Sequence, residues 1–323
     1  QIIAMTHSHI GNYGVHAAEY ESQGFKIAGM VCRNFSQQFS RADASGALQE
    51  QFEQQGIVAM EGLDTRQLVR HIRQQGAMNA MITTSPAPVE ELMQQLKDWP
   101  SMEGLNLAEK VSTTEPYTLG EASAARHVAV LDLGIKQHIL HNLVGLGCRL
   151  TVYPHSTGVE EFLASDANAF FISNGPGDPA AMDASVAKVR QLCESGRPVF
   201  GICMGHQLIA RSAGLQTYKM RFGHRGINHP VKNLVSGQAE ITSQNHGFAV
   251  QPPTPEETAS GVEITHLHLN DNTVAGLRLK NRPVFSVQYH PEAHPGPHDG
   301  RYLFQQFIDL IDAHRTPADA TPA

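Results

Sequence analysis

The chain has 323 residues, of which 41% are hydrophobic and 17% are charged, with a formal net charge of −7. This balance is typical of a globular protein with one or two domains and a sizeable core. The acidic charge argues against a surface for nucleic acid, and no apolar run approaches the ~20 residues of a membrane span. We therefore expect neither nucleic acid nor a membrane as a partner.

Four cysteines are spread along the chain, at Cys32, Cys148, Cys193 and Cys203. They lack the paired spacing of a metal site, and a reducing cytosol suits them. The first residues contain no basic region of a signal peptide and no transit-like stretch, so we see no targeting signal. These features predict a cytoplasmic protein.

In the first hundred residues, which open on a strand-like apolar stretch, the clearest local signal is a helix that begins near Asp64. Leu68 and Ile72 lie four residues apart with Val69 at their shoulder, so they form an apolar stripe on one helix face. Asp64 or Thr65 supplies the side-chain oxygen that caps such a helix. The arginines of this segment are expected on its solvated face.

A change of composition marks a domain boundary. Residues 112–126 are small and polar and show no periodicity, which predicts a linker at 119–126. The linker is followed by a near-continuous apolar run at 127–134, which is typical of a buried parallel strand.

From residue 127 onward, predicted strands and helices alternate. The strands are expected at 127–134, 149–153, 169–173 and 198–202, and the helices between and after them at 135–146, 160–164, 180–195 and 207–213. This order predicts βαβ units, a parallel sheet with right-handed crossovers, and ligand sites at the carboxyl ends of the strands. A helix at 302–314 closes the domain, and 316–323, rich in Pro, Ala and Thr, is predicted to be a disordered tail.

The most informative segment follows the strand at 198–202. Its sequence Gly-x-Cys-x-Gly, from Gly201 to Gly205, is the cysteine version of the nucleophile elbow, a sharp strand-to-helix turn. The glycines leave room that β-carbons would fill, and the helix N-terminus favours the thiolate of Cys203. A buried, inert cysteine between closely packed glycines is the alternative interpretation.

Two further strand ends favour catalysis. An alternating strand ends in His290-Pro291-Glu292, and residues two apart project on the same side. A nucleophilic cysteine needs a base, and the base needs a partner that fixes its tautomer. A third strand runs into the glycine-rich turn at 173–179, whose backbone N–H groups can stabilise an oxyanion. Together these segments predict Cys203, His290 and Glu292 as catalytic residues.

Eighteen histidines raise the question of a metal site, and we predict none. His294 and His298 are separated by prolines that forbid a shared helix face, and His266 and His268 alternate along a strand. We find no cysteine or carboxylate that completes a tetrahedral set. Since no Walker A or dinucleotide-binding motif occurs, ATP chemistry is expected on another chain.

Five segments, in order and spacing, resemble the small (glutaminase) subunit of carbamoyl-phosphate synthetase, within the class I glutamine amidotransferases. They are 173–179, 200–207, 222–231, 244–250 and 290–299. The resemblance implies an α/β fold, with a parallel-sheet amidotransferase domain at 127–315 preceded by a smaller α/β domain at 1–118. It also implies a segment upstream of this smaller domain, to which nothing here corresponds.

The resemblance implies a thioester mechanism. Cys203 attacks the side-chain amide of glutamine, His290 transfers the proton, and Glu292 holds the imidazole. Backbone N–H groups at Gly175 and Met204 are implied to stabilise the oxyanion. Further contacts to L-glutamine are expected at matching positions, namely Gly177, Gln207, Asn245, Gly247 and Phe248.

The resemblance also implies a partner. Ammonia is expected to pass through a tunnel into a large subunit, where ATP, with Mg, and bicarbonate yield carbamoyl phosphate for arginine and pyrimidine synthesis. The two chains are expected to form a heterodimer or a higher oligomer, with no cofactor in this chain. Three alternatives stay open. The first is an amidotransferase for GMP, CTP or anthranilate synthesis, and the Asp-Thr-Arg segment at 64–66 counts against it. The other two are a stand-alone γ-glutamyl hydrolase and a non-enzymatic regulatory or scaffold subunit.

Overall fold

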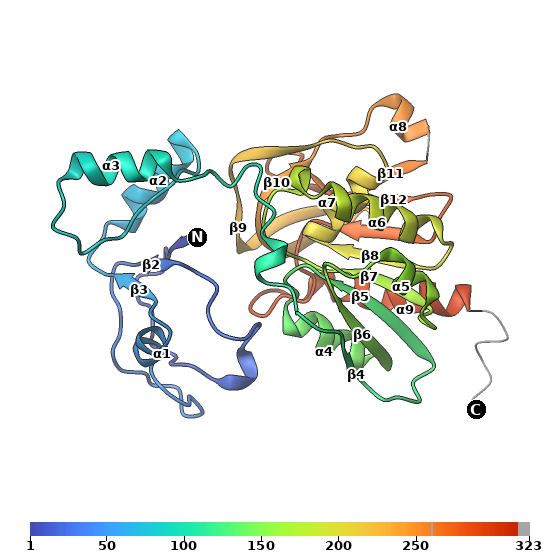
Figure 1. Ribbon diagram of the computed structural model, residues 1–323, viewed down its shortest axis with the longest axis horizontal. Coiled ribbons are helices and arrows are strands. Elements are labelled where there is room, and N and C mark those ends of the chain that lie inside the picture. Colours follow the sequence, from blue (N-terminus) through green and yellow to red (C-terminus); the bar gives the residue numbers. More distant parts are fainter. Residues whose placement is uncertain (260, 316–323) are drawn as a thin grey trace. The chain divides into compact units, whose positions relative to one another are not determined.

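The computed structural model describes residues 1–259 and 261–315 (Figure 1). The chain divides into two compact units, one of residues 1–101 and one from Met102 onward. The predicted tail at 316–323 lies outside the described residues. Within the described ranges, no helix combines the length and the apolar character that crossing a membrane requires.

The first unit contains a three-stranded parallel sheet in the order β1-β2-β3. Its elements are β1 (Ile2–Ala4), η1 (Ala17–Glu19), β2 (Gly29–Val31), α1 (Leu48–Gln54), β3 (Val58–Met60), α2 (Thr65–Gln75) and α3 (Val89–Asp98). Helix α2 confirms the predicted helix, because the side chain of Asp64 accepts a hydrogen bond from the backbone N–H of Gln67 at 2.9 Å. A small core forms around Met30, Cys32 and Phe52.

The second unit is built on a ten-stranded sheet in the order β10-β9-β11-β12-β13-β8-β7-β5-β6-β4. The strands are β4 (Tyr117–Leu119), β5 (Arg126–Asp132), β6 (Cys148–Pro154), β7 (Ala169–Ile172), β8 (Val199–Ile202), β9 (Thr217–Asn233), β10 (Ala239–Val250), β11 (Val262–His268), β12 (Val274–Leu279) and β13 (Val284–Val287). The helices are η2 (Ala108–Lys110), α4 (Gln137–Gly145), α5 (Val159–Ala164), η3 (Pro179–Ala181), α6 (Asp183–Glu194), α7 (Met204–Ser212), α8 (Pro255–Ala259), η4 (Asp299–Arg301) and α9 (Tyr302–His314).

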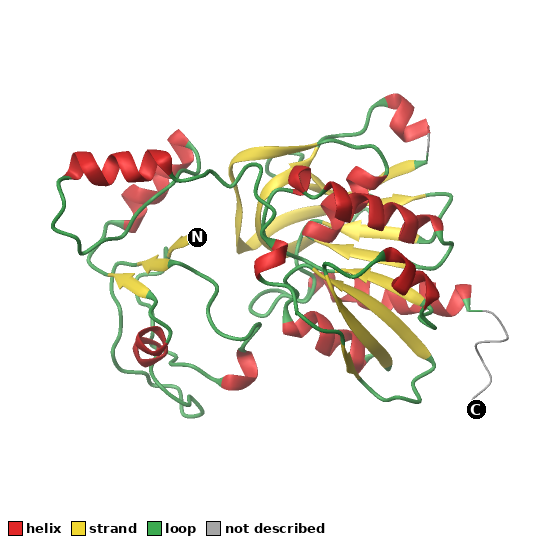
Figure 2. Cartoon of the chain, in the orientation of Figure 1, coloured by secondary structure: helices red, strands yellow, loops and turns green. Residues whose placement is uncertain are grey.

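Helices cover both faces of this sheet (Figure 2). Strand β5 contributes side chains to two hydrophobic cores, one on each face of the sheet, because successive side chains of a strand point to opposite faces. Ala129 and Leu131 pack in the core that includes residues of α5, α6 and α7, whereas Val128 and Val130 pack with residues of α4 and α9. An apolar run without alternation is therefore the pattern that a strand buried on both faces requires.

The structure confirms the predicted α/β fold and its parallel strands, and it adds an antiparallel part that the sequence analysis did not place. Strands β6, β5, β7, β8 and β13 are parallel neighbours. Beyond β13 the sheet continues antiparallel through β12, β11 and β9 to the long strand β10. The edge strand β4 also pairs antiparallel, with β6.

The two units divide before the predicted linker at 119–126. Residues from Met102 belong with the second unit, because Gly104 donates its backbone N–H to the Asp178 carboxylate at 2.9 Å and the Asp178 N–H donates to the Leu105 carbonyl at 2.9 Å. Residues 117–119, within the stretch 112–126 that shows no periodicity, form β4, which is an edge strand of the sheet.

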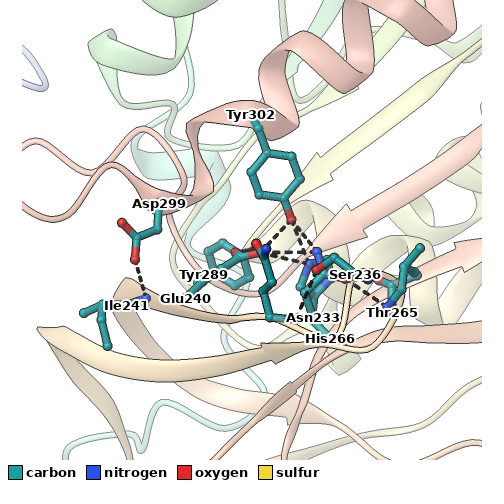
Figure 3. A network of polar contacts seen from close by, with 11 residues as sticks. Asn233, Ser236, Glu240, Ile241, Thr265, His266, Tyr289, Asp299 and Tyr302 are labelled. Atoms are coloured by element: carbon teal, nitrogen blue, oxygen red, sulfur yellow. Dashed lines mark hydrogen bonds and ion pairs between the residues drawn. The ribbon is translucent and has the colours of Figure 1, made fainter.

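A buried carboxylate ties the antiparallel part of the sheet to α9 (Figure 3). Glu240 on β10 is 6% exposed and accepts hydrogen bonds from the hydroxyls of Tyr289 at 3.0 Å and Tyr302 at 2.8 Å. The side-chain amide of Asn233 contributes a further hydrogen bond at 3.2 Å. The Nε2 of His266 lies 3.1 Å from the Tyr302 hydroxyl. A buried carboxyl group is tolerated here because several donors converge on it.

Replacing Glu240 with alanine should lower the free energy of unfolding of the second unit by about 3 kcal/mol, because the buried donors of Tyr289 and Asn233 and the more exposed hydroxyl of Tyr302 lose their acceptor. Glu240→Gln keeps one acceptor oxygen and should cost about 1–2 kcal/mol. Urea unfolding followed by circular dichroism measures both changes. The matched control is Glu121→Ala, at an exposed position, and equal losses in Glu240→Ala and this control would contradict the assignment.

Candidate active site

The predicted elbow lies between β8 and α7, at the carboxyl end of a central parallel strand. Cys203 has φ 55° and ψ −101°, a backbone conformation that residues other than glycine rarely adopt. It is 5% exposed. A β-carbon at Gly201 would lie 2.5 Å from Cδ1 of Ile209, and one at Gly205 would overlap the carbonyl of Ile172. The glycines on both sides of the cysteine are thus required by close packing, as the elbow interpretation predicted.

His290 lies next to Cys203 at the carboxyl end of the neighbouring strand, β13. Its backbone N–H donates to the Ser243 carbonyl at 2.9 Å, which fixes this segment against β10. Burial disfavours the imidazolium, but the charge of Glu292 and the hydrogen bonds with Cys203 and Glu292 outweigh it. They raise the pKa of His290 to about 10. The imidazole is therefore protonated at neutral pH, in the state that pairs with a thiolate.

Glu292 is fully buried and orients this histidine. Its Oε1 lies 2.6 Å from Nδ1 of His290 and 3.0 Å from Nζ of Lys136. Burial acts to raise the pKa of the carboxyl group, but the attraction to His290 and then to Lys136 lowers it below its ordinary value. The group consequently stays ionised at neutral pH.

Lys136 is a residue that the sequence analysis missed. It lies just before α4, beyond the end of β5, and its Nζ also donates to the carbonyl of Ala293 at 2.6 Å. The available signal was its position at the carboxyl end of a predicted strand, where ligand sites of parallel sheets lie. Sequence spacing alone does not connect it to a glutamate on a distant strand.

The predicted oxyanion donors are Gly175, after β7, and Met204, the first residue of α7. Among the described residues, neither backbone N–H donates to another protein group outside its own element. Asn174 anchors the loop, since its side chain accepts from the N–H of Lys136 at 3.1 Å and donates to the Gly134 carbonyl at 3.0 Å. Free N–H groups on an anchored backbone suit an oxyanion site.

Of the other predicted contacts, Gln207 and Phe248 meet directly. The Gln207 Nε2 donates to the Phe248 carbonyl at 2.8 Å, which joins α7 to β10. Asn245 and Gly247 precede Phe248 on the same strand. Gly177, with φ 110°, forms a bridge with Asn106, so its backbone has a structural role. Glutamine binding by all five residues stays a prediction.

One group of side chains places a carboxylate beside two histidines, although its three residues do not complete a tetrahedral set. Asp271 lies 2.9 Å from Nε2 of His224 and 3.4 Å from Nδ1 of His268, a spacing compatible with a metal ion. The two imidazole rings are stacked, 3.9 Å apart and 16° from parallel, so their in-plane lone pairs converge poorly on one ion. The hydrogen-bonded carboxylate accounts for this geometry, and the absence of a functional metal stays a prediction.

Comparison with known proteins gives two family matches. Residues 129–310 match the model for "Glutamine amidotransferase class-I", and residues 1–82 match that for "Carbamoyl-phosphate synthase small chain, CPSase domain". Similar curated proteins include the carbamoyl phosphate synthase small chains of Synechococcus sp. and Chlorobaculum tepidum, each 44% identical. The alignments cover 98% and 97% of this chain and 83% and 85% of those proteins.

A solved structure with the same fold comes from Thermoplasma acidophilum, where the protein is described as part of a GMP synthase. It matches with a TM-score of 0.52 and 20% identity over 59% of this chain and 96% of the other. At this identity the likeness concerns the fold alone.

Removing the charge of Glu292 should lower the pKa of His290. In Glu292→Gln the largest favourable interaction is lost while burial still disfavours the imidazolium, so deprotonation moves from about pH 10 to a lower pH. An NMR titration of histidine-labelled protein, with the His290 signal assigned from a His290→Asn sample, measures this shift. The exposed-site variant Glu121→Gln should leave the titration unchanged, and an unshifted His290 in Glu292→Gln would contradict the electrostatic coupling.

Proposed function

The chain belongs to the carbamoyl-phosphate synthase small-chain family, with a class I glutamine amidotransferase domain, and we propose that Cys203, His290 and Glu292 carry out its glutamine hydrolysis. The observation that supports this assignment most directly is the linked arrangement of the three side chains. A strained elbow cysteine contacts a histidine that is held by a buried carboxylate. These are the parts that cysteine-based acyl transfer needs.

The reaction begins from the thiolate–imidazolium pair. The Cys203 sulfur attacks the side-chain amide carbon of glutamine, and the N–H groups of Gly175 and Met204 stabilise the resulting oxyanion, for which one such donor typically contributes about 3 kcal/mol. His290 then protonates the amide nitrogen, the C–N bond breaks, and ammonia leaves. A thioester between Cys203 and the glutamyl group remains.

Hydrolysis of the thioester uses the same histidine as a base. The acylated sulfur carries no negative charge and therefore no longer stabilises the imidazolium, so the pKa of His290 falls. Neutral His290 can then take a proton from water as the water oxygen attacks the thioester carbonyl. Glutamate is released, and the proton returns the site to its starting state. Glu292 holds the imidazole throughout.

The small chain acts with a large chain. Free ammonia is mostly protonated at neutral pH, so it is a useful nucleophile only if it is delivered without mixing with solvent. We propose that it passes through a tunnel to the large chain, which binds ATP and Mg, and that this chain needs no cofactor. The match of residues 1–82 to the small-chain model favours this role over other amidotransferases. The four free cysteines are compatible with a reducing cytoplasm.

Replacing Cys203 with serine should abolish glutamine hydrolysis, with a loss of about 10⁴-fold or more, while leaving the fold intact. Carbamoyl phosphate synthesis by the assembled enzyme should continue on added ammonia, because that route bypasses the thioester. Steady-state assays with each nitrogen source measure both reactions. Glutamine-dependent turnover in Cys203→Ser would exclude Cys203 as the nucleophile.

Glutamine hydrolysis by the chain alone should be slow and should rise on assembly with the large chain. Uncoupled hydrolysis would release ammonia with no acceptor, so coupling requires the partner to favour the active geometry. A thousandfold gain corresponds to about 4 kcal/mol of differential binding. Glutaminase kinetics with and without the large chain test this, and equal turnover in both samples would contradict it.

A further inference from the structure

Lys136 connects parts of the site that lie far apart in the sequence. Its backbone N–H donates at 3.1 Å to the side chain of Asn174, which anchors the loop of a predicted oxyanion donor. Its Nζ donates to the Ala293 carbonyl at 2.6 Å and lies 3.0 Å from the Oε1 of Glu292. The side chain of Lys136 is 22% exposed, whereas that of Glu292 is fully buried. The ammonium therefore reaches from the surface to the carboxylate that orients the catalytic histidine.

Two cations meet the same oxygen of Glu292. Nδ1 of His290 lies 2.6 Å from Oε1, which is also the oxygen next to Lys136. The other oxygen, Oε2, is buried and has no hydrogen-bond partner among the described residues. If one cation loses its charge, the other is the remaining ion-pair partner of this carboxylate in the part of the chain that the structure describes.

The other titratable groups beside this pair do not supply a further cation. Cys203 interacts with His290 and is negatively charged as the thiolate. His246 on β10 also interacts with His290, but burial lowers the pKa of His246 well below its ordinary value, so this ring is neutral at neutral pH. Within the described ranges, charge compensation for Glu292 thus comes from His290 and Lys136.

The reaction removes one of these two positive charges. During acylation His290 is protonated and compensates Glu292 itself. Hydrolysis of the thioester needs neutral His290 as the base, and a buried carboxylate without a counter-charge is strongly disfavoured. Without Lys136, the pair of His290 and Glu292 would therefore retain its proton, on one group or the other. In both cases Nε2 of the imidazole would carry a hydrogen and could not accept one from water.

We propose that Lys136 is a positioning residue for hydrolysis of the thioester, because its ammonium compensates the charge of Glu292 while His290 is neutral. The inference rests on the proposed function and assigns Lys136 to the second half of the reaction. In that half, one proton of water passes to Nε2 of His290, and the oxygen, with the other proton, bonds to the thioester carbon. The Cys203 sulfur leaves as the thiolate, and Lys136 keeps its protons throughout.

The test separates the charge of Lys136 from its hydrogen bond, in the enzyme assembled with its large chain. Lys136→Met removes both, Lys136→Gln keeps a donor for the Ala293 carbonyl without the charge, and Lys136→Arg keeps the charge. Lys188→Met is the matched control, because Lys188 is also half-buried and its Nζ also donates to a backbone carbonyl, that of His155, at 2.6 Å. If Lys136→Met does not fold, Lys136→Gln provides the same comparison.

For each variant, kcat and KM for glutamine hydrolysis are measured against pH, and acid quenching traps the radiolabelled glutamyl enzyme. Lys136→Met and Lys136→Gln should lower kcat at neutral pH by about 10- to 100-fold, the effect that a neighbouring charge typically has on such an ionisation. KM should fall in parallel and the thioester should accumulate, because acylation still begins from the thiolate–imidazolium pair. Higher pH should restore kcat, because it removes the retained proton. Lys136→Arg and Lys188→Met should resemble the unaltered enzyme.

Equal losses in kcat and kcat/KM without trapped thioester would overturn the proposal, because Lys136 would then act on acylation or on the fold. Full activity in Lys136→Gln would also overturn it, because the hydrogen bond to Ala293 would then account for the effect. An equal loss in Lys188→Met has the same consequence. If the unaltered enzyme does not hydrolyse glutamine, or if Cys203→Ser still does, the proposed function itself fails, which is a different result.

Discussion

The arrangement around the nucleophile depends on one constraint, the complete burial of the Glu292 carboxylate. A buried charge is strongly unfavourable unless opposite charges and hydrogen bonds compensate it. Here the compensation comes from His290, two residues earlier, and from Lys136 at the start of a distant helix. The same compensation raises the pKa of His290 and so favours the thiolate of Cys203. Charge balance at one carboxylate therefore decides both the geometry and the protonation state of the site.

This balance is possible because the sheet brings strand ends together. Strands β5, β7, β8 and β13 are parallel neighbours, and their carboxyl ends carry Lys136, Gly175, Cys203 and His290 respectively. On β10, Ser243 fixes the backbone of His290, while the preceding residue, Tyr289, is bound by Glu240. Successive residues of this segment thus serve different purposes, one in the buried polar network and one next to the nucleophile.

The sequence predicted the parts of this structure that depend on local patterns. The strands and helices from 127 to 202, the cap at Asp64, the elbow and the His-x-Glu pair follow from periodicity and short motifs. The unpredicted features depend on contacts between distant segments: β4 within the stretch 112–126 that shows no periodicity, the antiparallel strands, and Lys136 against Glu292. Likewise, Asp271 meets His224 only because a turn after β11 folds back onto β9. The local sequence around each of these residues does not indicate which distant segment it contacts.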